Sequence, residues 1–228
     1  ATYGAAFAAS DAALARHIPT STVNRLLSSV NASVVAALAA VSLGRAWDAG
    51  ISDAPPMPAT VSAGIALMCG FLVYDTAAGL IRGFESSPRL MLVHHLVGLA
   101  GQSAAAAHGV GSITMAGIHL AELSTPLLHL SWLLLKLGYR QHPAFRALGL
   151  TLVATFFAVR VALPACLLWS YAAAAAPCAV YGGPGGLCAF LLAGLAFFWV
   201  MNCYWFGKLL RVALGGAPPP VKEVRVNR

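Results

Sequence analysis

The chain alternates long apolar segments with short polar ones, and this alternation is the strongest signal in the sequence. Six apolar stretches can be drawn, at 23–44, 60–81, 89–107, 112–135, 147–171 and 186–209. Each is near the ~20 residues that a helix needs to cross a hydrocarbon core of ~30 Å. The stretches are continuous and do not alternate with a period of two, and helices satisfy their own backbone hydrogen bonds in lipid. The pattern therefore predicts an all-α, polytopic membrane protein with six transmembrane helices.

The composition agrees with a membrane protein and leaves little room for a soluble domain. Hydrophobic residues make up 59% of the chain and charged residues 9%, whereas soluble domains carry about 25% charged residues. We expect one membrane domain at 23–213 and a basic cytosolic tail at 214–228. Residues 1–22 are rich in Ala with few charges, so we expect an N-terminal tail, either flexible or the remnant of a trimmed presequence.

The net charge is +7, and the positions of the basic residues along the chain explain this excess. With six spans, both termini and the second and fourth loops share one side of the membrane, and the other side has only Arg45. An excess of Lys and Arg is typical of the cytosolic side, so both termini are expected there, with no nucleic-acid partner. The basic residues on that side are Arg16, Arg25, Arg82, Arg89, Lys136, Arg140, Arg146, Lys208, Arg211, Lys222, Arg225 and Arg228.

A few polar residues lie inside the predicted spans, where their cost makes each one a candidate site residue. Glu122 and Arg160 are predicted near the midplane, and an ion pair between them would make both tolerable. Pro126 should disturb the helix at Glu122 because proline cannot donate to the carbonyl four residues before it. At ~1.5 Å per residue, the others fall in one layer of the cytosolic half: Asp75, His94, His95, His129 and Asn202.

The adjacent His94 and His95 suggest chemistry. A neutral imidazole acts as a general base or nucleophile when a partner orients it, and Asp75 lies at a suitable depth. Binding of a metal is disfavoured, because neighbouring side chains on a helix point ~100° apart. Packing across helices remains the simpler interpretation for His119 and His129. Helical phase brings His119, Glu122 and His129 of the fourth span within about 80° of one another. Together with the polar residues of the last two spans they are the candidate substrate-binding residues: His119, Glu122, His129, Arg160 and Asn202.

The cysteines do not indicate a cofactor or a zinc site. Cys178 and Cys188 flank the last loop, on the predicted non-cytosolic side. A disulfide between them is possible if that compartment is oxidising. The other cysteines of the spans are expected to be small core residues.

Several segments together resemble the TLC-domain family, the superfamily of ceramide synthases and translocating-chain-associated proteins. The chain is most similar to the small TLC-domain-containing transmembrane proteins, over roughly residues 20–213. The stretch at 121–134 after a histidine pair is the most specific feature. The segments that carry the resemblance are NRLLSSVNA (24–32), FLVYDTAAGLI (71–81), HHLVGLAGQ (94–102), AELSTPLLHLSWLL (121–134), FFAVRVAL (156–163) and VMNCYWFGKLLR (200–211).

The resemblance implies six helices around a central, lipid-accessible cavity, in the endoplasmic reticulum or another organellar membrane. It leads us to expect a protein that binds or handles lipid and contributes to membrane lipid homeostasis. In ceramide synthases a pair like His94-His95 transfers an acyl group from acyl-CoA to an amine, so the first alternative is an acyl-CoA-dependent N-acyltransferase. The second alternative is a structural subunit of a larger membrane assembly or a homo-oligomer.

Overall fold

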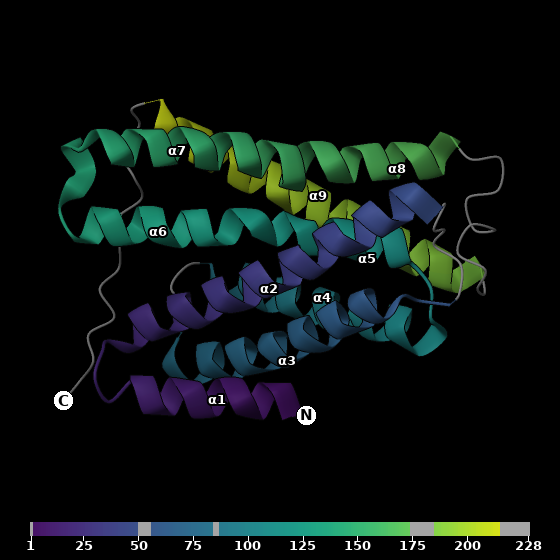
Figure 1. The fold of residues 1–228 in the computed structure, drawn as a ribbon, viewed down its shortest axis with the longest axis horizontal. Coiled ribbons are helices and arrows are strands. Elements are labelled where there is room, and N and C mark those ends of the chain that lie inside the picture. The colour runs from purple at the N-terminus through teal and green to yellow at the C-terminus, as the bar shows by residue number, and fades with distance from the viewer. Residues whose placement is uncertain (1, 50–55, 84–86, 174–184, 215–228) are drawn as a thin grey trace.

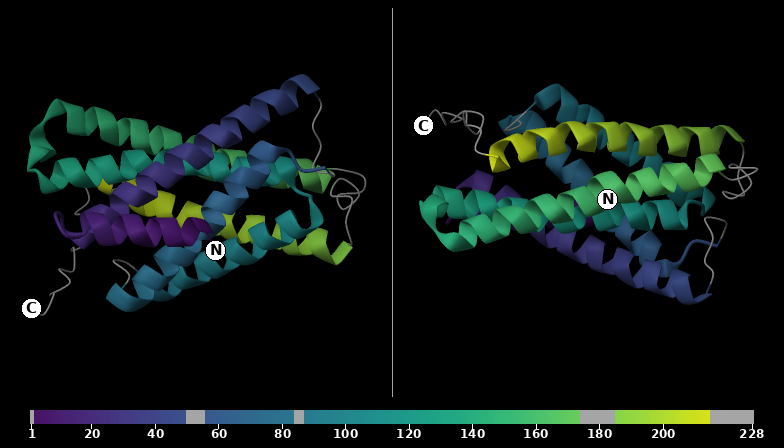
Figure 2. Two further views of the ribbon diagram at one scale, coloured as in Figure 1. Left: turned by 60° about the horizontal axis from the view of Figure 1, so that its bottom comes forward. Right: turned by 90° about the horizontal axis from the view of Figure 1, so that it is seen from above.

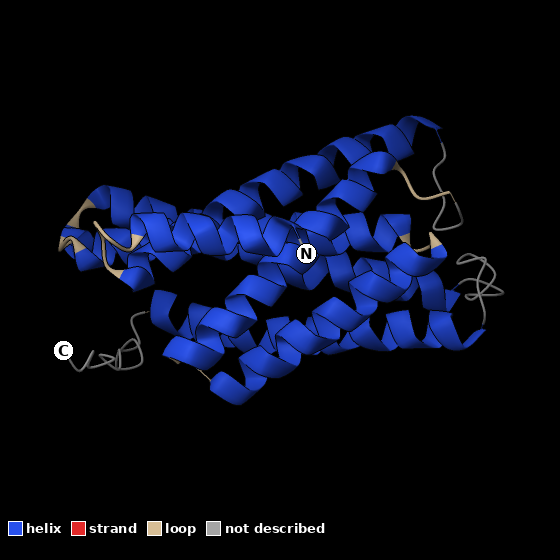
Figure 3. Cartoon of the chain, turned by 90° about the horizontal axis from the view of Figure 1, so that it is seen from below, coloured by secondary structure: helices blue, strands red, loops and turns tan. Residues whose placement is uncertain are grey.

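The computed structural model describes residues 2–49, 56–83, 87–173 and 185–214, and within these ranges all the regular elements are helices (Figure 3). The prediction of an all-α protein is confirmed. The elements are α1 Thr2–Leu14, α2 Thr20–Ala49, α3 Ala59–Arg82, α4 Pro88–His108, α5 Ser112–Leu120, η1 Ala121–Leu123, α6 Ser124–Lys136, η2 Tyr139–Gln141, α7 Pro143–Phe156, η3 Phe157–Ala162, α8 Leu163–Ala173 and α9 Gly185–Ala213.

Six helical segments among the described residues are long and apolar enough to cross a membrane, as predicted. Proline and glycine set several of their ends: Pro88 and Pro143 lie in the first turns of α4 and α7, where a preset φ and a missing N–H cost nothing. Gly83 and Gly138 take positive φ after α3 and α6. The segments are Thr20–Arg45, Ala59–Arg82, Pro88–His108, Ser112–Lys136, Pro143–Ala173 and Gly186–Ala213.

The six spans run roughly along the long axis of the molecule (Figures 1 and 2), and their contacts close them into a ring. Helix α2 contacts α3 on one side and the α5–α6 span on the other, and α3 continues to α4. Helix α4 contacts α9, α9 contacts the α7–α8 span, and α7 returns to α6. Because every span has a neighbour on both sides, side chains that face inward meet around a common centre.

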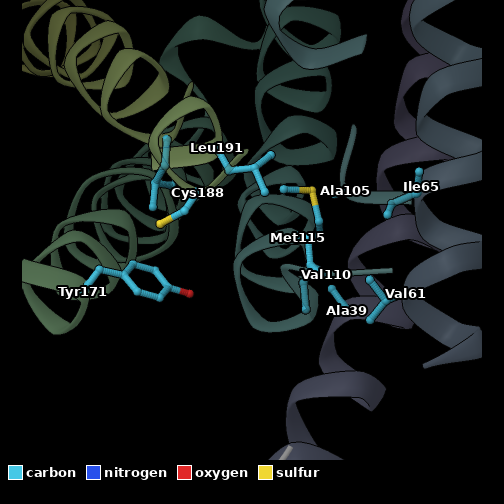
Figure 4. Close-up of a cluster of buried hydrophobic side chains, with 11 residues drawn as sticks. Ala39, Val61, Ile65, Ala105, Val110, Met115, Tyr171, Cys188 and Leu191 are labelled. Carbon is cyan, nitrogen blue, oxygen red and sulfur yellow. The ribbon is translucent and has the colours of Figure 1, made fainter. Parts of the chain in front are cut away.

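A cluster of buried apolar side chains from α2, α3, α4, α5, α8 and α9 lies at one end of the ring (Figure 4). Tyr171 of α8 also shares a hydrogen bond with Thr114 of α5, with 2.6 Å between the two hydroxyl oxygens. The cluster lies where α3, α5 and α9 begin. Its main members are Ala39, Val61, Ile65, Ala105, Val110, Met115, Tyr171, Cys188 and Leu191.

The fourth span is interrupted at its middle. The 3-10 turn η1 joins α5 to α6 at Ala121–Leu123. Pro126 follows Glu122 by four residues and has no N–H to give to the Glu122 carbonyl. The disturbance that Pro126 predicts is therefore present, as a tighter turn around Glu122.

The fifth span contains a π-helical turn, which was not among the predicted features. This turn, η3, covers Phe157–Ala162, and α7 and α8 continue through it as one rod (Figure 1). The N–H of Leu163 bonds to the carbonyl of Ala158, five residues back. Pro164 explains the spacing, because it cannot make the usual bond to the carbonyl of Arg160, four residues earlier. The nearby carbonyl of Val161 accepts a hydrogen bond from Nε1 of Trp199 in α9, at 3.1 Å.

The expectation of an N-terminal tail at 1–22 needs correction, because residues 2–14 form helix α1, packed along α3 (Figure 1). Small residues allow the two backbones to approach. A Cβ added to Gly70 would lie 2.5 Å from the Cβ of Tyr3, and one added to Gly4 would lie 3.2 Å from the Gly70 carbonyl oxygen. The Ala-rich composition that suggested a tail instead gives α1 a smooth face for this contact.

Aromatic and charged side chains hold the other end of α1. The ring of Phe7 lies 5.4 Å from that of Phe71 and 5.9 Å from that of Tyr74, centroid to centroid. Asp11 is 3% exposed and forms an ion pair with Arg82 at the end of α3. The pair removes the main obstacle to burying an acidic residue in an apolar helix.

Candidate functional site

A cavity lies inside the ring of helices, and its wall comes from α3, α4, α5, η1, η3, α8 and α9. It holds about 860 Å³ of space not filled by atoms, including space that opens to the outside. Most of its wall is apolar, as is usual for small-molecule sites. Its polar lining residues are His94, Gln102, Glu122, Arg160 and Asn202.

His94 faces this cavity from α4. Its ring lies 5.1 Å from the ring of Phe198 and 5.7 Å from that of Trp205, both on α9. Its Nδ1 atom is buried and has no hydrogen-bond partner among the described residues. A neutral imidazole carries one donor and one acceptor nitrogen, so His94 presents unused hydrogen-bonding capacity at the cavity wall.

His95 points elsewhere, because neighbouring side chains on a helix diverge by ~100°. It is 2% exposed and does not line the cavity. Its Nδ1 shares a hydrogen bond with Oγ1 of Thr76 at 2.9 Å, and its Nε2 lies 3.4 Å from Oδ2 of Asp75. The expected contact between Asp75 and the histidine pair is thus made to His95 and not to His94.

Asp75 is tied in turn to the first span. Asn24 of α2 donates from Nδ2 to Oδ1 of Asp75 at 2.9 Å, and the hydroxyl of Tyr74 donates to Oδ1 of Asn24 at 3.2 Å. These bonds link α2, α3 and α4 through polar groups in the half of the bundle where α2 begins. Asn24 and Thr76 were not predicted as site residues, although an Asn at the start of an apolar span is a polar residue that needs a partner.

Glu122 and Arg160 form the ion pair that the sequence predicts, with 3.1 Å between Oε1 and Nη2. Arg160 also donates from Nε to Oγ of Ser124 at 2.7 Å and from Nη2 to Oγ1 of Thr125 at 2.9 Å. The hydroxyl of Thr125 donates to Oε2 of Glu122 at 2.7 Å. Neither hydroxyl residue was predicted, although both follow Glu122 by only two and three residues.

Asn202 of α9 lines the cavity and is 5% exposed. Its Oδ1 atom accepts no hydrogen bond from the described residues. It follows Phe198 by four residues and precedes Trp205 by three, so all three share one face of α9. Because Phe198 and Trp205 both contact the His94 ring, Asn202 lies on the face of α9 that is turned to His94.

His119 and His129 were expected near Glu122 among the substrate-binding residues, but neither lines the cavity. His119 lies against Gly64 of α3 and shares a hydrogen bond between Nε2 and Oε1 of Gln102 at 2.9 Å. His129 shares one between Nδ1 and Oγ of Ser29 in α2 at 2.9 Å. For His129 the expectation assumed a regular helix, whereas the 3-10 turn rotates each residue by ~120° and shifts the helical phase after Glu122.

Two further expectations concern metals and disulfides. Within the described ranges, no three His, Cys, Asp or Glu side chains come together as metal ligands would. Cys178 lies outside the described residues, so its pairing with Cys188 stays a prediction.

Comparison with known proteins shows the family. The sequence model that describes the TLC-domain family matches residues 22–211. The chain belongs to the TLC-domain family. TLC domain-containing protein 4-B of Danio rerio is 28% identical over 143 residues, which are 61% of this chain and 53% of that protein. The chain thus matches about half the length of this curated relative, and no solved structure matches it.

Membership in the family and the six apolar helices together establish a multi-pass integral membrane protein. The cavity therefore lies at the depth of the acyl chains and not in a water-facing domain. Its charged lining residues are one acid and one base in contact with each other.

Proposed function

We propose that this TLC-domain protein binds lipid in the cavity of its helix ring and contributes to membrane lipid homeostasis. The observation that carries the proposal is the cavity itself, an apolar chamber with a few polar groups at membrane depth. Sites for small ligands are mostly apolar with a few placed polar groups, and lipid is the solvent that surrounds this one. Family membership supports the same assignment.

We further propose that both termini lie on the cytosolic side, in the endoplasmic reticulum or another organellar membrane. Lys and Arg concentrate on the side of the termini, which supports this orientation. The partners we propose are membrane lipids.

Lipid binding is tested by filling the cavity with a side chain. Gly101 lines the cavity, and a Cβ added there would meet no atom within 4 Å, so Gly101→Leu extends into the open space. Gly207 of α9 is the matched control, since it has the same free space but lies on the exposed surface.

Native mass spectrometry of the purified proteins measures the bound lipid. Wild type and Gly207→Leu should retain lipid, and Gly101→Leu should lose most of it at unchanged thermal stability. Equal retention by all three proteins would place the lipid outside the cavity. A wild-type protein free of lipid would favour the structural-subunit alternative.

A second candidate function is acyl-CoA-dependent N-acyl transfer, and the unpartnered Nδ1 of His94 favours it. In this reaction the amine nitrogen bonds to the thioester carbonyl carbon while His94 takes the amine proton. The carbon–sulfur bond breaks, and the thiolate of coenzyme A recovers that proton from the imidazole. His95 and Asp75 would position α4, since Asp75 contacts His95 and not His94.

This candidate is tested with purified protein, acyl-CoA and a long-chain amine. Product from the wild type, lost in His94→Ala but not in Gly207→Leu, supports the transferase. Absence of product from a wild-type protein that retains bound lipid leaves lipid binding alone. A thermal unfolding transition of His94→Ala equal to that of the wild type shows that the variant is folded.

A further inference from the structure

The charges on the cavity wall cancel. Glu122 and Arg160 are its charged lining residues, and they pair with each other at 3.1 Å. Arg160 makes further bonds to Ser124 and Thr125, and Glu122 accepts one from Thr125. An anionic or cationic head group would therefore enter a low-dielectric chamber without a free counter-charge, which is costly.

Two of the lining residues each carry a buried hydrogen-bonding atom that has no partner among the described residues. Oδ1 of Asn202 is buried and accepts no hydrogen bond from the described residues, and Nδ1 of His94 is buried without a partner as well. A buried polar atom left unsatisfied costs free energy that a ligand can return. Asn202 Oδ1 requires a donor, and the imidazole offers either a donor or an acceptor.

The two residues share one level of the cavity. Asn202 lies between Phe198 and Trp205 on one face of α9, and both rings contact the ring of His94. A ligand group between α4 and α9 can thus meet both residues. A hydroxyl group fits best, because it donates to Asn202 and also accepts from the imidazole.

We propose that the cavity selects a lipid with an uncharged, hydroxyl-bearing head group, held by Asn202 and His94 with its chain along the apolar wall. This inference rests on the lipid-binding function proposed above. An ester head group supplies no donor for Asn202. A carboxylate or an ammonium head group carries a charge that the Glu122–Arg160 pair does not balance.

The inference is tested with four ligands that share one oleyl chain and differ in the head group: oleyl alcohol, methyl oleate, oleate and oleylamine. The full chain is placed in lipid nanodiscs with tritiated oleyl alcohol, and the unlabelled ligands compete for binding. We expect oleyl alcohol to compete best, and the other three to compete about tenfold less well.

Variants locate the head group. Asn202→Leu should weaken the binding of oleyl alcohol about tenfold and leave that of methyl oleate unchanged, because only the alcohol uses the Asn202 oxygen. Gly207→Leu, on the exposed face of the same helix, should leave both unchanged. If Asn202→Leu fails to fold, the ligand series on the wild type still decides the question.

Several outcomes would overturn the inference and leave lipid binding intact. Competition by oleate or oleylamine equal to that by oleyl alcohol would show that charge is accepted. Equal competition by methyl oleate would show that the hydroxyl is not recognised, and so would failure of oleyl alcohol to bind a protein that retains other lipids. If none of the four binds and no lipid co-purifies, the proposed function itself fails.

Discussion

Glu122 and Arg160, with 3.1 Å between Oε1 and Nη2, lie in two neighbouring spans at corresponding places: each belongs to a non-α turn, four residues before a proline. In both spans the proline removes a backbone hydrogen bond beside the charged residue. The ion pair and the two irregular turns therefore occupy one region of the cavity wall, where side chains and backbone are both polar.

The ion pair should be strongly coupled. Glu122→Ala leaves Arg160 without its carboxylate partner and should lower the free energy of unfolding by about 3 kcal/mol or more. Unfolding in mixed detergent micelles measures the change. The double variant with alanine at both positions should cost less than the sum of the single variants, because it leaves no unpaired charge. Strict additivity would contradict the contact.

The bond between Trp199 and the Val161 carbonyl should stabilise the π turn. Trp199→Phe removes the indole donor and should cost about 1 kcal/mol, the scale of hydrogen bonds between membrane helices. Trp169→Phe is the control, since Trp169 is 76% exposed on α8. Unfolding of both variants in the same micelles compares them, and an equal loss would show that the bond to Val161 contributes nothing.

Gly64 should be intolerant of a side chain. A Cβ at this position would lie 2.9 Å from Nδ1 of His119, whose ring is held by Gln102. Gly64→Ala should therefore destabilise the protein by about 1–3 kcal/mol. Gly149→Ala, where a Cβ meets nothing within 4 Å, should stabilise helix α7 by up to about 1 kcal/mol. Thermal unfolding distinguishes the two, and a gain in both would show that His119 moves freely.

Docking of α1 on α3 should depend on Gly70. A methyl group there would lie 2.5 Å from the Cβ of Tyr3, so Gly70→Ala should push α1 away from α3. Hydrogen exchange should then accelerate in the amides of α1 and stay unchanged in the six spans. Gly149→Ala serves as the control, and continued protection of α1 in Gly70→Ala would contradict the close contact.

The sequence predicts the spans and the ion pair because both follow from the cost of polarity in lipid. Continuous apolar stretches of the right length leave few alternatives to spanning helices. Glu122 and Arg160 carry opposite charges at the same estimated depth, so each is the other's natural partner. These conclusions need only a position along the membrane normal.

The direction in which a side chain points is harder to predict. His129 bonds to Ser29 of α2 and not to the cavity wall at Glu122, because a 3-10 turn lies between His129 and the preceding helix. A shift of helical phase leaves depth almost unchanged but alters the neighbours of every later residue. The π turn before Pro164 shifts the helical phase of the next span in the same way. Ser and Thr are also so common in spans that the hydroxyl partners of Arg160 do not stand out in the sequence.

Helix α1 escaped prediction for a different reason. Its 13 residues are too few to cross the bilayer, and its Ala-rich sequence has no clear polar face. The features that dock it, Gly70 and Arg82, belong to α3 and reveal their partners only in three dimensions.

Pro126 and Pro164 make the backbone of the cavity wall irregular, whatever side chains line the cavity. A peptide carbonyl freed from its helix keeps its dipole whatever residue occupies the position. A relative that had exchanged Glu122 and Arg160 for aliphatic residues, but kept Pro126 and Pro164, would still lack the helical hydrogen bond that each proline cannot donate. Such a protein would prefer different ligands, while its fourth and fifth spans kept the same two irregular turns.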